Sequence, residues 1–247
     1  MINLERRAGL PIFLKKDNAL GSKSLKLPKA DARTFSQIKQ VLMSQKTSVK
    51  NFYFMYRNVA PKDSFAKYGL RYDITVIPGN KIGSEEVKTA GHYHARVKGT
   101  ALTFPEVYQV IKGKAIYLLQ KKTGRKISDV IVAKASAGDV VLVPPNYGHI
   151  TINPSKETLV MANIVYGGFK SQYREIAEKR GGAYYAVEKN RKIVFIKNPN
   201  YKSAPKIRFR KPKMQGLKSP IYQDCVKNPE KYLFLIKPQK YKGKMRI

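Results

Sequence analysis

Residues 106–152, EVYQVIKGKAIYLLQKKTGRKISDVIVAKASAGDVVLVPPNYGHITI, contain the pattern that decides the fold. Short runs of β-branched and aromatic residues alternate there with turns rich in Gly, Pro and Asn, such as Pro144-Pro145-Asn146. These runs predict strands over 106–111, 114–120, 128–133, 139–143 and 149–152. Strands this short and closely spaced, with hardly any helix between them, indicate an antiparallel barrel or jelly roll.

The same pattern continues on both sides of this stretch. It predicts further strands over 51–57, 72–77 and 158–165, a helical turn over 173–179 and a hairpin over 183–196. Before the first strand, four apolar residues recur at helical spacing and predict one amphipathic helix over 31–45: Phe35, Ile38, Val41 and Leu42. Residues 1–30 are punctuated by Gly and Pro, so we expect an irregular segment there.

The charge is large and unevenly distributed. Lys and Arg number 49 against 16 Asp and Glu, which gives a formal net charge of +33, most of it in the flanks. We therefore divide the chain into an N-terminal extension with one helix (1–50), a barrel domain (51–201) and a basic C-terminal extension (202–247). Because the last segment also contains Tyr222, Phe234 and Leu235, we expect it to pack across the surface of the barrel.

Several classes of protein are excluded by composition. Cys225 is the single cysteine, so an internal disulfide framework is ruled out and a reducing compartment is expected. The apolar runs are far shorter than the ~20 residues that span a bilayer. The N-terminal residues lack the long apolar segment of a signal peptide. We expect a cytoplasmic protein with no membrane partner.

The three histidines are placed to bind one metal ion. His92 and His94 are two residues apart, and in a strand such residues point to the same face. Glu106 begins the next strand and His149 a later one, so a barrel can bring all four side chains to one interior point. Three imidazoles and a carboxylate leave positions open on an octahedral ion, which suits Fe²⁺, Mn²⁺, Ni²⁺ or Zn²⁺. We place Fe²⁺ first among these.

The spacing around these residues resembles the two motifs of the cupins. Glu106 is followed by six residues and Gly113, while Gly138 is followed by five residues and Pro144. His149 is followed by three residues and Asn153. Two departures are an insertion of eleven residues, 95–105, between His94 and Glu106, and Asn146 where the second motif often has Gly. The resemblance implies an all-β cupin double-stranded β-helix, a jelly-roll barrel.

Longer stretches are more specific. The sequences TAGHYH (89–94), PEVYQV (105–110), PPNYGH (144–149), IAEK (176–179) and GGAYY (181–185) together resemble the cupin-type glucose-6-phosphate isomerases of archaea and some bacteria. The resemblance extends over roughly 51–201. It implies a homodimeric, metal-dependent enzyme that interconverts glucose 6-phosphate and fructose 6-phosphate in glycolysis and gluconeogenesis.

The resemblance also implies roles for individual residues. The metal ligands would be His92, His94, Glu106 and His149, with Glu106 also the candidate for proton transfer. The phosphate-binding positions would be Thr75, Thr89 and Gly91, and the tyrosines of the sugar pocket would be Tyr53, Tyr108 and Tyr173. Archaeal forms have a lysine where this chain has Ala90, and we expect Lys88 to substitute for it.

The residues are compatible with this chemistry on general grounds, and two alternatives stay open. Aldose–ketose isomerisation needs a carboxylate base that forms an enediol, or a metal that polarises both oxygens for hydride transfer. The first alternative is another sugar-phosphate isomerase or epimerase, for instance one acting on mannose 6-phosphate. The second is a nucleic-acid-binding protein, suggested by the net charge and by basic runs such as KIRFRK (206–211). It is not favoured, because no recognised nucleic-acid motif is present.

Overall fold

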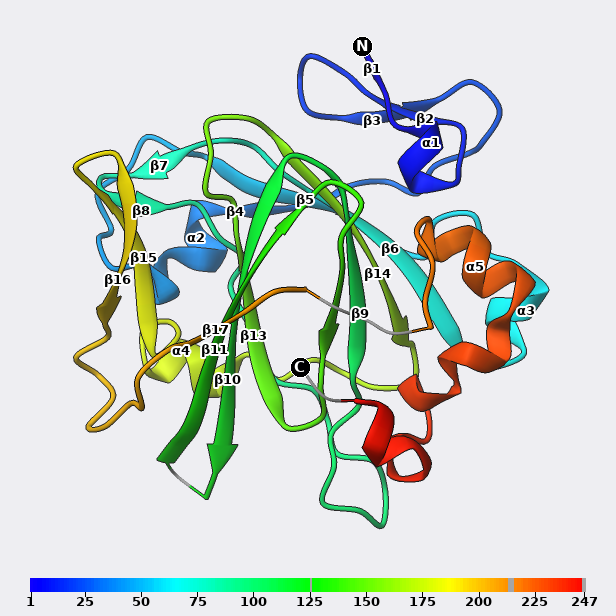
Figure 1. Ribbon diagram of the computed structural model, residues 1–247. Helices are drawn as coiled ribbons and strands as arrows, with labels where there is room; N and C mark the ends of the chain where they lie inside the picture. The colour runs from blue at the N-terminus through cyan, green and yellow to red at the C-terminus, as the bar shows by residue number, and fades with distance from the viewer. Residues whose placement is uncertain (125, 213–215, 246–247) are drawn as a thin grey trace.

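Two sheets packed face to face form the barrel in the computed structural model, which describes all residues except 125, 213–215 and 246–247 (Figure 1). One sheet has the strand order β12-β9-β14-β6-β5-β4 and the other the order β13-β10-β11-β17. The strands of the first are β4 (Asp31–Thr34), β5 (Asn51–Tyr56), β6 (Leu70–Ile77), β9 (Glu106–Lys112), β12 (Val140–Val143) and β14 (Leu159–Tyr166). Those of the second are β10 (Lys114–Thr123), β11 (Lys126–Ser136), β13 (Tyr147–Ile152) and β17 (Arg208–Arg210). The all-β jelly-roll barrel expected from the sequence is confirmed.

Alternation of apolar side chains explains why these segments are strands. All pairings in the six-stranded sheet are antiparallel, as are those of β10 with β11 and β13, whereas the short β17 runs parallel to β11. Successive side chains of a strand point to opposite faces, so each strand contributes one row to the barrel interior and one row to its outside. Two apolar clusters result, one mainly inside the barrel and one on the outer face of the six-stranded sheet.

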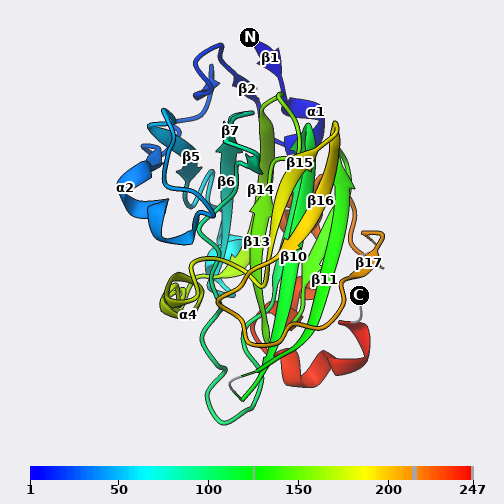
Figure 2. The ribbon, with the colours of Figure 1, turned by 90° about the vertical axis from the view of Figure 1, so that its left-hand side faces the viewer.

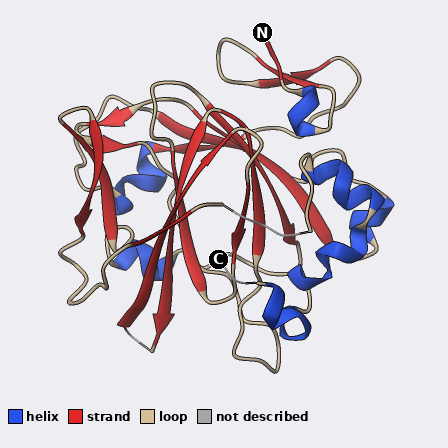
Figure 3. Ribbon diagram, in the orientation of Figure 1, coloured by secondary structure: helices blue, strands red, loops and turns tan. Residues whose placement is uncertain are grey.

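A second four-stranded sheet, built of shorter strands, lies beside the sheet of β13, β10, β11 and β17 (Figures 1 and 2). Its order is β16-β15-β8-β7, with β7 (Lys81–Ile82), β8 (Glu85–Glu86), β15 (Tyr184–Lys189) and β16 (Lys192–Lys197). The predicted hairpin over 183–196 is thus confirmed, and so is the predicted helical turn, which forms α4 (Arg174–Glu178). Helices lie at the periphery (Figure 3), and among the described residues none is both long and apolar enough to cross a membrane.

The predicted N-terminal helix over 31–45 is mostly wrong. Residues 31–34 form β4 and pair with β5, and only one α-helical turn follows, α2 (Phe35–Ile38), before the 3₁₀ turn η1 (Lys39–Val41). The physical reason is the capping box that Thr34 forms with Gln37. It makes the helix begin at Phe35, four residues after the predicted start. The apolar spacing still marks buried residues, because Ile38 and Leu42 both pack into the barrel core.

The expectation of an irregular segment over 1–30 is also wrong in part. It contains a three-stranded sheet of β1 (Ile2–Asn3), β2 (Ile12–Leu14) and β3 (Leu20–Ser22), with one helical turn, α1 (Glu5–Ala8). Strands of two or three residues are too short to show a periodic signal in the sequence. A further turn of helix, α3 (Asp63–Ala66), connects β5 to β6.

The C-terminal extension packs on the barrel, as expected. It forms α5 (Ile221–Lys227), η2 (Pro229–Leu235) and η3 (Pro238–Lys244), whose apolar side chains share one cluster with the outer face of the six-stranded sheet and with the N-terminal segment. Buried Gln109 of β9 ties these parts together. Its amide nitrogen donates to the Arg7 carbonyl at 2.6 Å and to Ser219 Oγ at 2.8 Å, and its oxygen accepts from the Ile221 amide at 2.8 Å.

Candidate active site

A cavity inside the barrel brings together all ten residues that the sequence predicted for the site. Strand alternation accounts for most of its wall. The lining side chains alternate along each strand: Tyr53 and Met55 of β5, Arg71, Asp73 and Thr75 of β6, Glu106 and Tyr108 of β9, and Met161, Asn163 and Val165 of β14. The predicted residues in the lining are Tyr53, Thr75, Thr89, Gly91, His92, His94, Glu106, Tyr108, His149 and Tyr173.

Gly91 switches which side of the chain faces this cavity. Upstream of it the odd residue Thr89 lines the wall, whereas downstream the even residues His92 and His94 do. Its φ of 74° is in the left-handed region, and a β-carbon there would lie 2.3 Å from Ile150 Cγ1. Only glycine has both the conformation and the size for this position. Gly91 therefore has a structural reason to be present, independent of any contact with phosphate.

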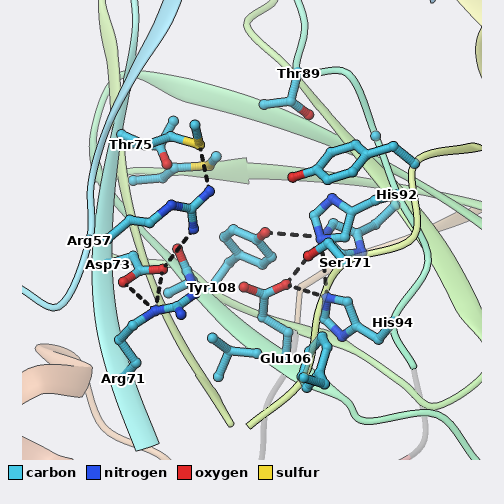
Figure 4. Close-up of a pocket in the computed structure, with 18 of the residues that line it drawn as sticks. Arg57, Arg71, Asp73, Thr75, Thr89, His92, His94, Glu106, Tyr108 and Ser171 are labelled. Carbon is cyan, nitrogen blue, oxygen red and sulfur yellow. Dashed lines mark hydrogen bonds and ion pairs between the residues drawn. The ribbon is translucent and has the colours of Figure 1, made fainter. Parts of the chain in front are cut away.

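The four candidate metal ligands converge at one end of the cavity (Figure 4). Their ligand atoms all lie within 4.8 Å of one another. Glu106 Oε2 is 3.3 Å from His94 Nε2 and 3.2 Å from His149 Nε2. The Nε2 atoms of His92 and His94 are 3.2 Å apart, and His92 is joined to His149 by a pair of backbone hydrogen bonds.

The insertion over 95–105 does not displace Glu106. The inserted loop folds back on itself through a bridge between Arg96 and Thr103, so Glu106 returns beside His94. The loop also contributes to the site, since the Phe104 carbonyl lies 2.8 Å from His94 Nδ1. A hydrogen bond to Nδ1 orients the ring and leaves Nε2 to bind a metal ion.

The electrostatics of the cluster match a cation site. Burial lowers the pKa of His92 and of His149, so both rings are neutral and can offer a lone pair. Burial raises the pKa of Glu106, but its contacts with His149 and His94 outweigh that effect and hold the pKa well below its usual range. Glu106 Oε2 is buried without a well-formed hydrogen bond to any described residue. An ionised carboxylate oxygen in this position fits a divalent cation, which these four residues could hold.

The predicted hydroxyl groups lie around this cluster. The Tyr108 hydroxyl is 3.1 Å from His149 Nε2, and the ring of exposed Tyr173 lies 5.1 Å from that of His92. The Tyr53 hydroxyl accepts a hydrogen bond from the Ala90 amide at 3.3 Å, and burial raises its pKa to about 12. Thr89 Oγ1 accepts from the Thr151 amide at 3.0 Å.

The expectation that Lys88 substitutes for a phosphate-binding lysine is wrong. Its side chain is buried away from the cavity, paired with Glu85 and 4.7 Å from the centre of the Tyr185 ring. The reason is the alternation of an extended chain: because Thr89 faces the cavity, its neighbour Lys88 points the other way.

Three charged residues in the cavity were missed by the sequence analysis: Arg57, Arg71 and Asp73. Asp73 Oδ1 accepts hydrogen bonds from Arg71 Nε and from the Asn58 amide, each at 2.8 Å. A signal for these residues was available. Arg71 and Asp73 precede Thr75 at the two-residue spacing of a strand face, and Arg57 follows Tyr53 at twice that spacing.

Comparison with known proteins connects this geometry to a family. The glucose-6-phosphate isomerase (GPI) family matches residues 30–203. Curated glucose-6-phosphate isomerases from Thermococcus litoralis and Pyrococcus furiosus are 32% and 34% identical over 133 residues, which is 54% of this chain. That segment spans 65% of the length of either relative. The glucose-6-phosphate isomerase of Thermococcus kodakarensis is 27% identical over 201 residues, 80% of this chain and 98% of the relative.

Among solved structures, oxalate oxidase in complex with the substrate analogue glycolate resembles the chain with a TM-score of 0.36 and 18% identity. That match covers 51% of this chain and 55% of the other. The assignment is carried by the family match, which includes the strands that supply the cavity and all four residues of the histidine–glutamate cluster. The chain belongs to the glucose-6-phosphate isomerase family.

Proposed function

We propose that this chain is a metal-dependent aldose–ketose isomerase that interconverts glucose 6-phosphate and fructose 6-phosphate. The observation that carries the proposal is the buried Glu106 carboxylate between His94 and His149, at the end of a cavity lined with hydroxyl groups. Family membership supports the substrate. Thr75, Thr89 and Gly91 are assigned to the phosphate, and the tyrosines at 53, 108 and 173 to the sugar.

The donor set fits a divalent cation. His92, His94 and His149 would hold it through their imidazole nitrogens, and Glu106 through Oε2. Imidazole and carboxylate ligands suit Fe²⁺, which we place first, and also Mn²⁺, Ni²⁺ and Zn²⁺. When bound, such an ion supplies Lewis-acid polarisation of the oxygens on C1 and C2 of the sugar.

In the enediol route, Glu106 transfers the proton between the two carbons. Its carboxylate accepts the proton from C2 of the aldose, breaking the C2–H bond, and returns a proton to C1 to form the new C–H bond. O1 gains a proton and O2 loses one, so that the aldehyde becomes a primary alcohol and the C2 alcohol becomes a ketone. The Tyr108 hydroxyl, 3.1 Å from His149 Nε2, is a phenol available to hydrogen-bond an oxygen at this edge.

In the hydride route, the hydrogen moves from C2 to C1 with its electron pair, while a proton moves from O2 to O1. Glu106 then acts only as a ligand and as a fixed negative charge. The low pKa of Glu106 is favourable for holding a cation in either route. Only the enediol route uses Glu106 as a general base. The two routes therefore predict different effects on kcat when the charge of Glu106 is removed.

Product analysis tests the proposal. Purified protein supplemented with Fe²⁺ is incubated with glucose 6-phosphate, and in parallel with mannose 6-phosphate, and the products are identified by NMR. We expect fructose 6-phosphate from the glucose substrate at the higher kcat/KM. Faster turnover of mannose 6-phosphate would instead assign the cavity to a related isomerase.

We further propose that the chain acts as a homodimer in the cytoplasm, as its family resemblance suggests. The outer face of the six-stranded sheet is occupied by the N- and C-terminal segments of the same chain, so a partner would have to contact another surface. Light scattering coupled to size-exclusion chromatography measures the mass directly. A mass of about one chain under assay conditions would contradict the dimer.

A further inference from the structure

The end of the cavity opposite the histidines carries positive charge (Figure 4). Arg57 and Arg71 both line the cavity, and Asp73 lies between them. The two guanidinium groups and the Asp73 carboxylate together leave a net charge of +1 at this end of the cavity. The predicted phosphate-binding residue Thr75 is on the same face of β6, two residues after Asp73. The missing cation of the predicted phosphate site is therefore present in other segments than that of Lys88: Arg57 directly follows β5, and Arg71 is in β6.

The two arginines are held unequally. Arg71 donates from Nε to both oxygens of Asp73, at 2.8 Å and 3.0 Å. Arg57 has weaker partners, Asp73 Oδ2 at 3.4 Å and the sulfur of Met55 at 3.2 Å. A guanidinium group has five N–H donors in a planar fork that matches the oxygens of a phosphate. Asp73 is thus neutralised mainly by Arg71, and the charge of Arg57 remains available to a ligand.

The strand register places the two ends of the cavity in line. Across β14, Val165 pairs with Arg71 on one side and with Glu106 on the other, and Asn163 likewise pairs with Asp73 and Tyr108. Two strand spacings, about 10 Å, thus separate the backbones of the cationic end and the Glu106 end. A hexose 6-phosphate has the same polarity, because its reacting carbons and its phosphate are at opposite ends of the carbon chain.

We propose that Arg57 binds the phosphate group of the sugar-phosphate substrate and that Asp73 positions it. The proposal rests on the proposed isomerase function. Arg57 takes the place that the sequence analysis gave to Lys88, with Thr75 and Thr89 as hydroxyl donors on the same group. Because phosphate stays bound throughout the reaction, Arg57 acts on substrate affinity and specificity rather than on the chemical step.

Kinetics of charge variants test this assignment. In Arg57→Gln we expect KM for glucose 6-phosphate, and the inhibition constant of inorganic phosphate, to rise about 10- to 100-fold, as for a lost hydrogen bond to a charged group. kcat should change little, because an interaction made equally in the ground and transition states affects KM alone. Arg57→Lys keeps the charge without the fork and should recover part of the affinity.

Arg208→Gln is the matched control. Arg208 is also paired with an aspartate, Asp129, and its side chain is 45% exposed against 41% for Arg57, but it lies outside the cavity on β17. This variant should leave KM and phosphate inhibition unchanged. If Arg57→Gln behaves like the control in both measurements, Arg57 is only a structural ion pair and the proposal is overturned.

Binding of inorganic phosphate tests the role of Arg57 separately from the proposed isomerase activity. Calorimetric titration of inorganic phosphate into wild type and Arg57→Gln requires no turnover. Wild-type protein that binds phosphate through Arg57 but does not isomerise glucose 6-phosphate would contradict the isomerase assignment and support the anion site. Equal phosphate affinity in the two proteins would overturn the anion site even if the isomerase activity is present.

Discussion

The two faces of β6 differ in almost every property. Its even residues are apolar and pack outward against the two terminal extensions: Leu70, Tyr72, Ile74 and Val76. Its odd residues Arg71, Asp73 and Thr75 are polar and line the cavity. The Tyr72 ring makes an edge contact with Tyr222 of α5 at 5.0 Å, while one residue later Asp73 holds two arginines. A single strand thus packs against the terminal segments on one side and lines the proposed substrate cavity on the other.

The same division recurs on β9. Val107 and Ile111 pack in the outer cluster and Gln109 bonds to the C-terminal extension, whereas Glu106 and Tyr108 face the cavity. The difference teaches that the terminal segments on the outer face, residues 1–30 and 217–245, stabilise the sheet, while none of their described residues lines the cavity. Substitutions on the two faces should therefore separate effects on activity from effects on folding.

The largest effect is expected at Glu106. Glu106→Gln keeps the shape of the side chain but removes its charge and its ability to accept a proton. With metal in excess, we expect kcat to fall about 10²–10⁴-fold, the usual contribution of a general base. Steady-state kinetics at saturating metal measures this, and the melting temperature serves as the control for folding. Near wild-type kcat in the metal-saturated variant would favour the hydride route.

The adjacent residues Ile74 and Thr75 give the sharpest contrast between the two faces. Ile74→Ala removes a fully buried side chain from the outer cluster and should lower the free energy of unfolding by about 2–5 kcal/mol. The folded fraction should keep its kcat/KM, because no cavity residue changes. Urea denaturation and kinetics on the same preparation measure both quantities. A large loss of kcat/KM in the folded protein would break the division between the faces.

Thr75→Val should give the reverse result. It removes one hydroxyl from the cavity wall, and the loss of one hydrogen bond to the substrate should lower kcat/KM about 3- to 10-fold. Because Thr75 has the barrel interior and not the terminal extensions as its neighbour, the unfolding curve should shift far less than in Ile74→Ala. Unchanged kcat/KM would mean that the Thr75 hydroxyl does not contact the substrate.

Much of the barrel could be predicted from the sequence, and so could ten residues that line one cavity. Strands with regular alternation, such as β9 and β13, were located because side chains of one face recur every second residue. His92, His94 and His149 were found because imidazoles are rare in this chain and their spacing is specific. Arg57 was missed because an arginine in a chain with 49 basic residues carries little information by itself.

The remaining errors have local physical causes. The N-terminal helix was overextended because spacing alone could not show that residues 31–34 pair with β5. Lys88 was misplaced because its charge was considered without the direction of its side chain, which buried pairing with Glu85 fixes. The packing of the C-terminal extension was foreseen only in outline, because its contacts with Gln109 join residues more than 100 positions apart.

The smallest effect concerns the net charge. A molecule with a formal charge of +33 attracts a phosphate dianion, and salt screens this attraction over about 8–10 Å. We expect kcat/KM for glucose 6-phosphate to fall several-fold with rising ionic strength, while kcat stays nearly constant. Kinetics at low and high salt test this. A salt-independent kcat/KM would assign the charge to another purpose, such as nucleic-acid binding.

The central claim is that the histidine–glutamate cluster holds a metal ion on which isomerisation depends. The most direct measurement combines metal analysis with the isomerase assay, before chelation, after chelation and after Fe²⁺ is added back, for wild type and for His149→Ala. The account predicts that activity disappears with the metal and returns with Fe²⁺ in wild type, and that His149→Ala remains folded but retains less metal. Full activity in metal-free protein, or unchanged metal content in His149→Ala, would contradict it.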